Sequence, residues 1–165
     1  MTSHATLHLI YGKIASGKST LARHLAAENA AVLICEDEWL VRLEAKIETF
    51  DDYLVHARRL RAALTPHVIQ ILKLGTSVVL DIPANTPGIR AWMRSLFEDA
   101  EASHLLHVVD APDDLCKARL RLRNESRPEG LYWGHVPESV FDPVTRLIVP
   151  PSDAEAFAIK RHTAE

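Results

Sequence analysis

The chain has 165 residues, of which 47% are hydrophobic and 25% charged, a balance typical of a folded domain rather than of a disordered segment. Its formal net charge of −3 gives no general attraction to nucleic acid, and no stretch approaches the ~20 apolar residues of a membrane span. The first nine residues lack the cationic start and apolar run of a secretion signal, so we expect one domain over residues 1–165, located in the cytoplasm.

The N-terminal half alternates strand-like and helix-like segments. An apolar run at residues 6–11 predicts a strand that ends at a glycine, and a helix is expected to begin near residue 18. A second strand is predicted at 31–35, with three acidic residues directly after it. Residues 51–74 predict a helix in two pieces. Thr65 followed by Pro66 is the pattern of an N-cap and a first helical residue, which indicates that a second helix begins there.

The C-terminal half continues the alternation. In chain order we expect a strand at 77–82, a helix at 86–100, a strand at 104–110, a helix at 113–123 and a short strand at 156–160. A polar segment with Gly and Pro up to residue 135 predicts a mobile loop, and Pro137 begins a further helical segment. Alternating β and α units predict a parallel sheet covered by helices, with its chemistry at the carboxyl ends of the strands.

Residues 12–19 carry the most informative motif, because Gly-Lys-Ile-Ala-Ser-Gly-Lys-Ser matches the phosphate-loop pattern G-x-x-x-x-G-K-[ST] between a strand and a helix. Glycines let backbone N–H groups converge on phosphate oxygens, and the helix start adds its positive dipole end. We expect Lys18 to reach the β- and γ-phosphates of ATP and the Ser19 hydroxyl to ligate Mg²⁺. A glycine turn with an exposed lysine is the alternative. The expected nucleotide-binding residues are Gly12, Lys13, Ile14, Ala15, Ser16, Gly17, Lys18, Ser19 and Thr20, together with Arg119 from a later helix.

Asp37 follows the second predicted strand and Asp81 lies at the end of the third, so the two carboxylates should meet near the phosphate loop. Asp81 has the strand context of an acid that orients Mg²⁺ directly or through water, or else it caps a turn. Asp37 is the candidate general base that accepts the proton of an attacking hydroxyl. Glu36 and Glu38 compete for that role, although strand alternation would send them to the opposite side, and a solvated acidic turn is also possible.

A stripe of arginines precedes the polar loop. Arg119, Arg123 and Arg127 share one helix face if the helix continues that far, while Lys117 and Arg121 lie on the other side. Side chains that favour burial flank the stripe: Leu115, Cys116, Leu120 and Leu122. We expect Arg123 and Arg127 to act catalytically on developing charge and residues of about 119–135 to form a lid, with a solvated basic face as the alternative.

These motifs together resemble the bacterial AAA-type, zeta-toxin-like group of P-loop kinases. The resemblance covers most of the chain, and its anchors are residues 12–20, Asp37, 78–81, 85–86, 116–124 and 150–151. It implies an α/β P-loop NTPase fold with a five-stranded parallel sheet in the order 2-3-1-4-5. The segment 123–127 is also similar to the lid of polynucleotide kinases, which implies that Arg127 touches the phosphoryl group in transit and that Asp37 is the general base.

We therefore expect an ATP-dependent phosphotransferase, with ATP and Mg²⁺ as cofactors, that moves the γ-phosphoryl group to a hydroxyl of a small-molecule acceptor. The lid motif keeps a 5′-hydroxyl nucleic-acid kinase open as an alternative, although the chain lacks the long basic groove that such an acceptor favours. A non-catalytic module in which ATP closes the lid and exposes a partner surface is another alternative. No membrane partner is expected.

Overall fold

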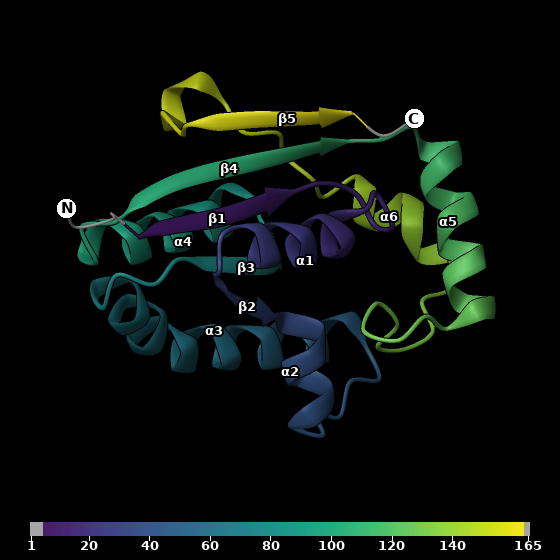
Figure 1. Ribbon diagram of the computed structural model, residues 1–165. Helices are drawn as coiled ribbons and strands as arrows, with labels where there is room; N and C mark the ends of the chain where they lie inside the picture. Colours follow the sequence, from purple (N-terminus) through teal and green to yellow (C-terminus); the bar gives the residue numbers. More distant parts are fainter. Residues whose placement is uncertain (1–4, 164–165) are drawn as a thin grey trace.

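The computed structural model describes residues 5–163, which contain a five-stranded sheet in the order β2-β3-β1-β4-β5 (Figure 1). All four strand pairings are parallel. This is the sheet order and the P-loop NTPase fold that the family resemblance implies. The strands are β1 (Thr6–Tyr11), β2 (Val32–Cys35), β3 (Val78–Pro83), β4 (Ser103–Asp110) and β5 (Ile159–Thr163).

Helices alternate with these strands along the chain. They are α1 (Lys18–Glu28), α2 (Glu36–Arg42), α3 (Phe50–Lys73), α4 (Pro87–Asp99), α5 (Asp113–Ser126) and α6 (Phe141–Thr145), with 3₁₀ turns η1 (Glu138–Val140) and η2 (Asp153–Glu155). Within residues 5–163, no helix has both the length and the apolar character needed to cross a membrane.

The two faces of the sheet bury different residues because side chains alternate along each strand. Leu7 and Leu9 of β1 belong to the larger core, which also contains apolar residues of α3 and α4. Ile10 of β1 and Val79 of β3 belong to a second cluster with residues of α1. The sheet is therefore packed on both faces. The arrowheads of β1, β4 and β5 point toward the end where α5 lies (Figure 1), and β2 and β3 run parallel to them.

Helix α3 is continuous through Pro66, so the predicted division into two pieces is wrong. The Thr65 hydroxyl donates to the Arg61 carbonyl 2.8 Å away instead of capping a new helix start. The N-terminal cap lies at Thr49, whose side chain accepts the Asp52 N–H in a capping box. Burial of one face of α3 in the core outweighs the backbone hydrogen bond that a helical proline removes.

Three other predicted boundaries shift. The fifth strand was expected at 156–160 but occupies Ile159–Thr163, because Phe157 packs beside Phe97 and Ala156 adopts a left-handed backbone with φ of 51°. Strand β3 ends at Pro83, one residue beyond the predicted 77–82, and α5 extends to Ser126 rather than ending at 123. The capped start of α4 at Thr86 is confirmed, since its side chain accepts the Ile89 N–H.

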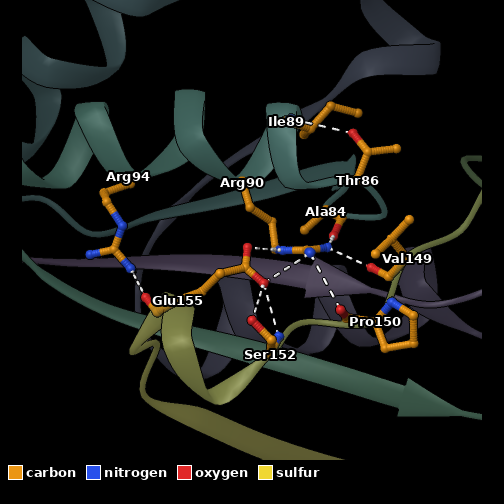
Figure 2. A network of polar contacts seen from close by, with 9 residues as sticks. All are labelled: Ala84, Thr86, Ile89, Arg90, Arg94, Val149, Pro150, Ser152 and Glu155. Carbon is orange, nitrogen blue, oxygen red and sulfur yellow. Dashed lines mark hydrogen bonds and ion pairs between the residues drawn. The ribbon is translucent and has the colours of Figure 1, made fainter.

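A buried arginine fixes the segment that leads into β5 (Figure 2). Arg90 of α4 is 0% exposed, and its guanidinium donates to the carbonyls of Ala84 and Val149 at 2.9 and 2.8 Å. It also pairs with both carboxylate oxygens of Glu155, at 2.7 and 3.0 Å. Because the Val149 N–H in turn donates to the Asn85 carbonyl, this network ties residues 149–155 to the turn between β3 and α4.

Candidate functional site

The loop between β1 and α1 turns sharply at the carboxyl edge of the sheet. Ala15 and Gly17 have positive φ values of 55° and 106°, and the Ser16 N–H closes the turn on the Lys13 carbonyl at 3.2 Å. A Cβ on Gly12 would lie 2.6 Å from Ser16 Oγ and 3.0 Å from a backbone oxygen, so only glycine fits there. The glycines of the motif are therefore used where the backbone geometry requires them.

Side chains from distant segments hold this loop in place. The Asn85 side chain, two residues after β3, accepts the Gly12 N–H at 3.0 Å and donates to the Gly12 carbonyl at 2.9 Å. Lys13 pairs with Asp113 of α5 at 2.5 Å, and Arg119 donates to the Ser16 carbonyl at 3.3 Å. The structure thus places Arg119 against the loop, where its predicted role in nucleotide binding stays a prediction, while the double contact of Asn85 was not anticipated.

Lys18 begins α1 and points back into the loop. Its Nζ donates to the carbonyls of Gly12, at 2.8 Å, and Lys13. Burial lowers the pKa of Lys18 to about 8, while the carboxylates of Asp81 and Asp37 act in the opposite direction. The Lys18 ammonium therefore lies beside the loop, and phosphate oxygens can replace the two carbonyls as its hydrogen-bond acceptors.

The loop has the properties of a phosphate cradle. No side chain caps the N-terminus of α1, so amide hydrogens of the first turn remain available to an anion. Ser16 is 1% exposed, and its Oγ has no hydrogen-bond partner within residues 5–163. A buried orphan hydroxyl, free helix amides and a lysine at one point fit a triphosphate.

Asp37 and Asp81 meet beside Lys18, as expected from the strand ends. Asp81 lies opposite Cys35 in the pairing of β3 with β2, and Asp37 lies two residues beyond Cys35, in the first turn of α2. Burial and the nearby carboxylates of Glu36 and Asp81 raise the pKa of Asp37 to about 6, against the pull of Arg123 and Lys18. Although protein atoms surround Asp37 closely enough to shift its pKa, its side chain remains accessible to solvent.

The acids next to Asp37 have other partners. Glu36 is buried and accepts hydrogen bonds from Arg61, at 2.7 and 3.0 Å, and from the Tyr53 hydroxyl at 2.6 Å. Glu38 pairs with Arg42 one turn along α2. The predicted separation by strand alternation is wrong because the three acids lie in a helix, but the contacts still leave Asp37 as the uncommitted carboxylate.

The metal prediction rests on a small donor set. Among residues 5–163 there is no group of three or more His, Cys, Asp or Glu arranged to hold an ion. Mg²⁺ is commonly bound by one or two protein oxygens together with substrate phosphates rather than by a full protein cage. The Ser19 hydroxyl in the first turn of α1 and the Asp81 carboxylate are oxygen donors of this kind, so the residues present fit that mode.

Helix α5 presents two of the three predicted arginines to the site. Arg119 contacts the phosphate loop, and Arg123 lies close enough for its charge to lower the pKa of Asp37. Burial lowers the pKa of Arg123 itself, and its Nε is buried without a partner in the described chain. Arg127 lies outside the helix with φ of 46°, exposed, its guanidinium 5.8 Å from the Tyr132 ring centroid.

The opposite face of α5 supports the helix rather than the site. Lys117 pairs with Asp142 and Arg121 with Glu138, both at 3.0 Å, as the angular separation of the two basic sets suggests. Leu122 was expected to be buried beside the stripe but is 62% exposed.

The loop after α5 is closed at its base. The Asn124 side chain donates to the Val136 carbonyl at 2.8 Å and accepts the Val136 N–H at 3.2 Å. The same loop approaches α1, because a Cβ on Gly130 would collide with the Arg23 guanidinium. The predicted lid thus has a defined base and a contact with the helix that follows the phosphate loop.

Solved structures share this architecture at low sequence identity. A candidate kinase from Chloroflexus aurantiacus has a TM-score of 0.74 and 18% identity, over 98% of this chain and 88% of its own. Chaetomium thermophilum Kti12 in complex with ADP-AlF3 has a TM-score of 0.71 and 17% identity, over 96% of this chain and 88% of its own. A sugar kinase from Janibacter has a TM-score of 0.62 and 17% identity, over 96% and 85%. These likenesses show the fold.

The family assignment comes from a different comparison. No curated protein matches the chain. A family model described as an AAA domain matches residues 7–151, which span the phosphate loop, both acids and the whole of α5. The chain therefore belongs to this AAA domain family, a P-loop kinase-like family.

Proposed function

We propose that the protein is an ATP-dependent phosphotransferase that moves the γ-phosphoryl group of ATP to a hydroxyl of a small molecule. The observation that carries this proposal is the convergence of four charged side chains, from four different elements, beside the phosphate loop: Lys18, Asp37, Asp81 and Arg123. Phosphoryl transfer requires positioned cations for the transferring group and a base for the acceptor, and this set supplies both.

The nucleotide is assigned to the loop and its supports. Residues 12–20 bind the phosphates, Lys18 contacts the β- and γ-oxygens, and Arg119 adds positive charge from its position at the Ser16 carbonyl. The bound ADP-AlF3 in Kti12 supports nucleotide binding by a protein of this fold. Ser19 and Asp81 would hold Mg²⁺, which supplies charge neutralisation at the phosphates when it is bound.

The chemical roles follow from protonation and position. Asp37 accepts the proton of the acceptor hydroxyl. Unlike Glu36 and Glu38, its carboxylate forms no ion pair within residues 5–163, and its pKa of about 6 keeps most of it ionised near neutral pH. Arg123 places positive charge beside Asp37, where the transferring group would pass. Arg127, on the predicted lid of about 119–135, would join it on lid closure, as the likeness to polynucleotide kinase lids suggests. The sugar kinase among the structural neighbours supports a small-molecule acceptor.

Radiolabelled ATP tests the proposal directly. Incubation with ATP labelled at the γ-phosphate, Mg²⁺ and a panel of hydroxylated metabolites should yield a labelled product. Asp37→Asn should reduce the transfer rate by roughly 10²- to 10⁴-fold, the usual contribution of a general base. Glu38→Gln is the matched control on the same helical turn and should retain activity, because Arg42 is the one ion-pair partner of Glu38 within residues 5–163.

Label found only as inorganic phosphate across the panel would contradict the kinase assignment. A 5′-hydroxyl oligonucleotide in the same panel distinguishes a nucleic-acid kinase, which would label it in preference to small molecules. An ATP-responsive module would bind ATP without producing any labelled product, and Asp37→Asn would leave its function unchanged.

The pH dependence provides a second test. Asp37 acts in its ionised form, so kcat/KM should rise as pH increases through about 6. Lys18 acts in its protonated form, so kcat/KM should fall as pH increases through about 8. A bell-shaped profile is therefore expected, and Asp37→Asn should remove its acidic limb. A flat profile between pH 5 and pH 7 in the unaltered protein would exclude Asp37 as the base.

A further inference from the structure

A pocket of about 590 Å³ opens between α3 and α4, beside the carboxyl edge of the sheet. Its polar lining comes from Arg58, Arg61, Thr65 and Thr86. A volume of this size is within the range of small-molecule sites. The pocket is therefore large enough for a metabolite and lies outside the nucleotide loop.

The charged side chains of this pocket are all positive. Its lining contains two arginines and no acid. Arg61 is already paired with Glu36 through two hydrogen bonds, so its charge is neutralised and its position is fixed. Arg58 forms neither an ion pair nor a hydrogen bond with any of residues 5–163, and its guanidinium remains available to an anion. The N-terminus of α4 adds the positive end of its dipole at Thr86.

The rest of the lining is apolar. Trp92 is fixed by a hydrogen bond from its indole N–H to Thr65 Oγ1 at 2.9 Å, so its ring forms a rigid wall. Leu54, 41% exposed, and Ile89 contribute further apolar surface. A cation beside a rigid aromatic wall suits an organic anion better than a small inorganic ion.

Two contacts connect this pocket to the transfer site. Thr86 is the next residue after Asn85, whose side chain binds Gly12 of the phosphate loop. Arg61 binds Glu36, the residue before Asp37. The pocket lining thus includes Thr86, next to the residue that binds the cradle, and Arg61, which binds the residue before the candidate base.

A larger cavity of about 940 Å³ flanks the other side of α3, against α2. Its lining mixes Glu44 with Lys46 and Arg59, so it has no preference for one sign of charge. Neither of the links to Gly12 and Glu36 involves its lining residues. The observations therefore favour the smaller pocket as the place where a defined ligand class is recognised.

We propose that the α3–α4 pocket binds the anionic group of the phosphoryl acceptor through Arg58, and that the acceptor is a small hydroxylated organic acid, a carboxylate or a phosphate ester. This inference rests on the proposed kinase function. Arg58 selects the charge, Trp92 contacts the body of the acceptor, and the free hydroxyl extends toward Asp37.

Binding to the pocket can be measured without catalysis. With Trp39→Phe and Trp133→Phe as background, Trp92 is the single tryptophan and reports ligand binding by fluorescence. The probes are 4-hydroxybenzoate, 4-hydroxyphenyl phosphate and the uncharged 4-hydroxybenzamide. Saturable changes with one or both anions, and at least tenfold weaker binding of the amide, are expected; the tighter anion identifies the acid class.

Two neighbouring arginines provide the matched comparison. Arg58→Gln should weaken anion binding about tenfold or more, whereas Arg59→Gln, in the other cavity, should leave it unchanged. Arg58→Lys should restore most of the loss because it retains the charge, and melting temperatures check that each variant is folded. No saturable response to either anion, equal binding of the amide, or equal effects of the two glutamine variants would overturn the proposal.

Transfer assays separate this inference from the kinase assignment. If anions bind through Arg58 but no acceptor is ever labelled from ATP, the kinase assignment fails and the anion site stands. If labelled product forms while Arg58→Gln leaves the acceptor KM unchanged, the kinase assignment stands and the acceptor pocket is wrong. The joint proposal predicts a raised acceptor KM with a smaller change in kcat.

Discussion

At the scale of single residues, the phosphate loop depends on one amide side chain outside the motif. The Asn85 side chain forms hydrogen bonds with both the N–H and the carbonyl of Gly12, and the same carbonyl also accepts a hydrogen bond from Lys18 Nζ. Asn85 therefore sets the position of the residue at which the strand becomes the loop. A change at this side chain should alter the nucleotide site before it alters the fold.

Replacing Asn85 with alanine removes two hydrogen bonds, each with a net contribution of about 1 kcal/mol. We expect ATP affinity to fall roughly tenfold in calorimetric titrations, since about 1.4 kcal/mol corresponds to one factor of ten. Asn29→Ala is the control, because Asn29 binds Leu25 at the far end of α1. Equal ATP affinity in the two variants would show that the Gly12 contact does not position the loop.

The motif itself is predictable because it is local, whereas its supports are not. Eight consecutive residues specify the glycine turn and the place of Lys18, and each physical requirement lies within that stretch. Asn85 reaches Gly12 across 73 positions in the sequence, and Glu36 reaches Arg61 across 25. Such partners depend on how strands and helices pack, and a single sequence does not reveal that packing.

At the scale of elements, Arg90 joins three segments through one buried side chain (Figure 2). The end of β3, the segment after Val149 and the turn containing Glu155 all converge on its guanidinium. The pKa of Glu155 is lowered, chiefly by its hydrogen bond from Arg90. A buried cation with so many acceptors is difficult to replace, because its removal leaves carbonyls and a carboxylate unsatisfied.

Arg90→Leu should therefore reduce the free energy of unfolding by about 3 kcal/mol or more, as is typical when one partner of a buried ion pair is removed. Urea unfolding measures this loss. Arg42→Ala breaks an exposed i,i+4 ion pair and should cost less than about 0.5 kcal/mol. Similar losses in the two variants would mean that the Arg90 network is not a main anchor of the C-terminal segment.

Element boundaries differ in how far they follow from local signals. The start of α4 was correctly predicted because Thr86 and Pro87 form a complete capping signal. The Thr65 and Pro66 pair carries the same residues, yet α3 runs through it because the helix face is buried on the sheet. The short α2 was missed, since nothing local distinguishes its acidic first turn from the end of a strand.

At the scale of the whole molecule, a row of histidines crosses three adjacent strands. His8 of β1 lies 3.0 Å from His107 of β4 between ring nitrogens, and His107 lies 2.9 Å from His162 of β5. Burial lowers the pKa of all three, that of His107 to about 4. These rings are therefore neutral near pH 7 and connect the first strand to the edge of the sheet.

This row makes the fold sensitive to acid. Below pH 6.5 the unfolded chain protonates its histidines while the folded state resists, so stability falls as pH decreases toward 4. His107 alone should account for a loss on the order of 3 kcal/mol over that window. Denaturant unfolding at several pH values should show a smaller loss for His107→Gln than for the control His24→Gln, whose ring is exposed. Identical pH dependence in the two variants would contradict the role of the row.

The sheet order is predictable at this scale because the family resemblance implies it, whereas the alternation of elements alone predicts only a parallel sheet covered by helices. The residues gathered at the carboxyl edge follow from that order: Asp37 and Asp81 end near Lys18 because β2 and β3 are neighbours and β3 pairs with β1. Arg127 is different, because the helix that would place it on the stripe ends at Ser126. Its role stays a prediction.

Calorimetric titration of the folded protein with ATP in the presence of Mg²⁺ tests the phosphate cradle most directly. We predict binding at one site, at least tenfold weaker in Lys18→Ala through loss of a charged hydrogen-bond donor, and unchanged in Lys73→Ala at the far end of α3. Absence of binding, or equal affinity in the two lysine variants, would contradict the account.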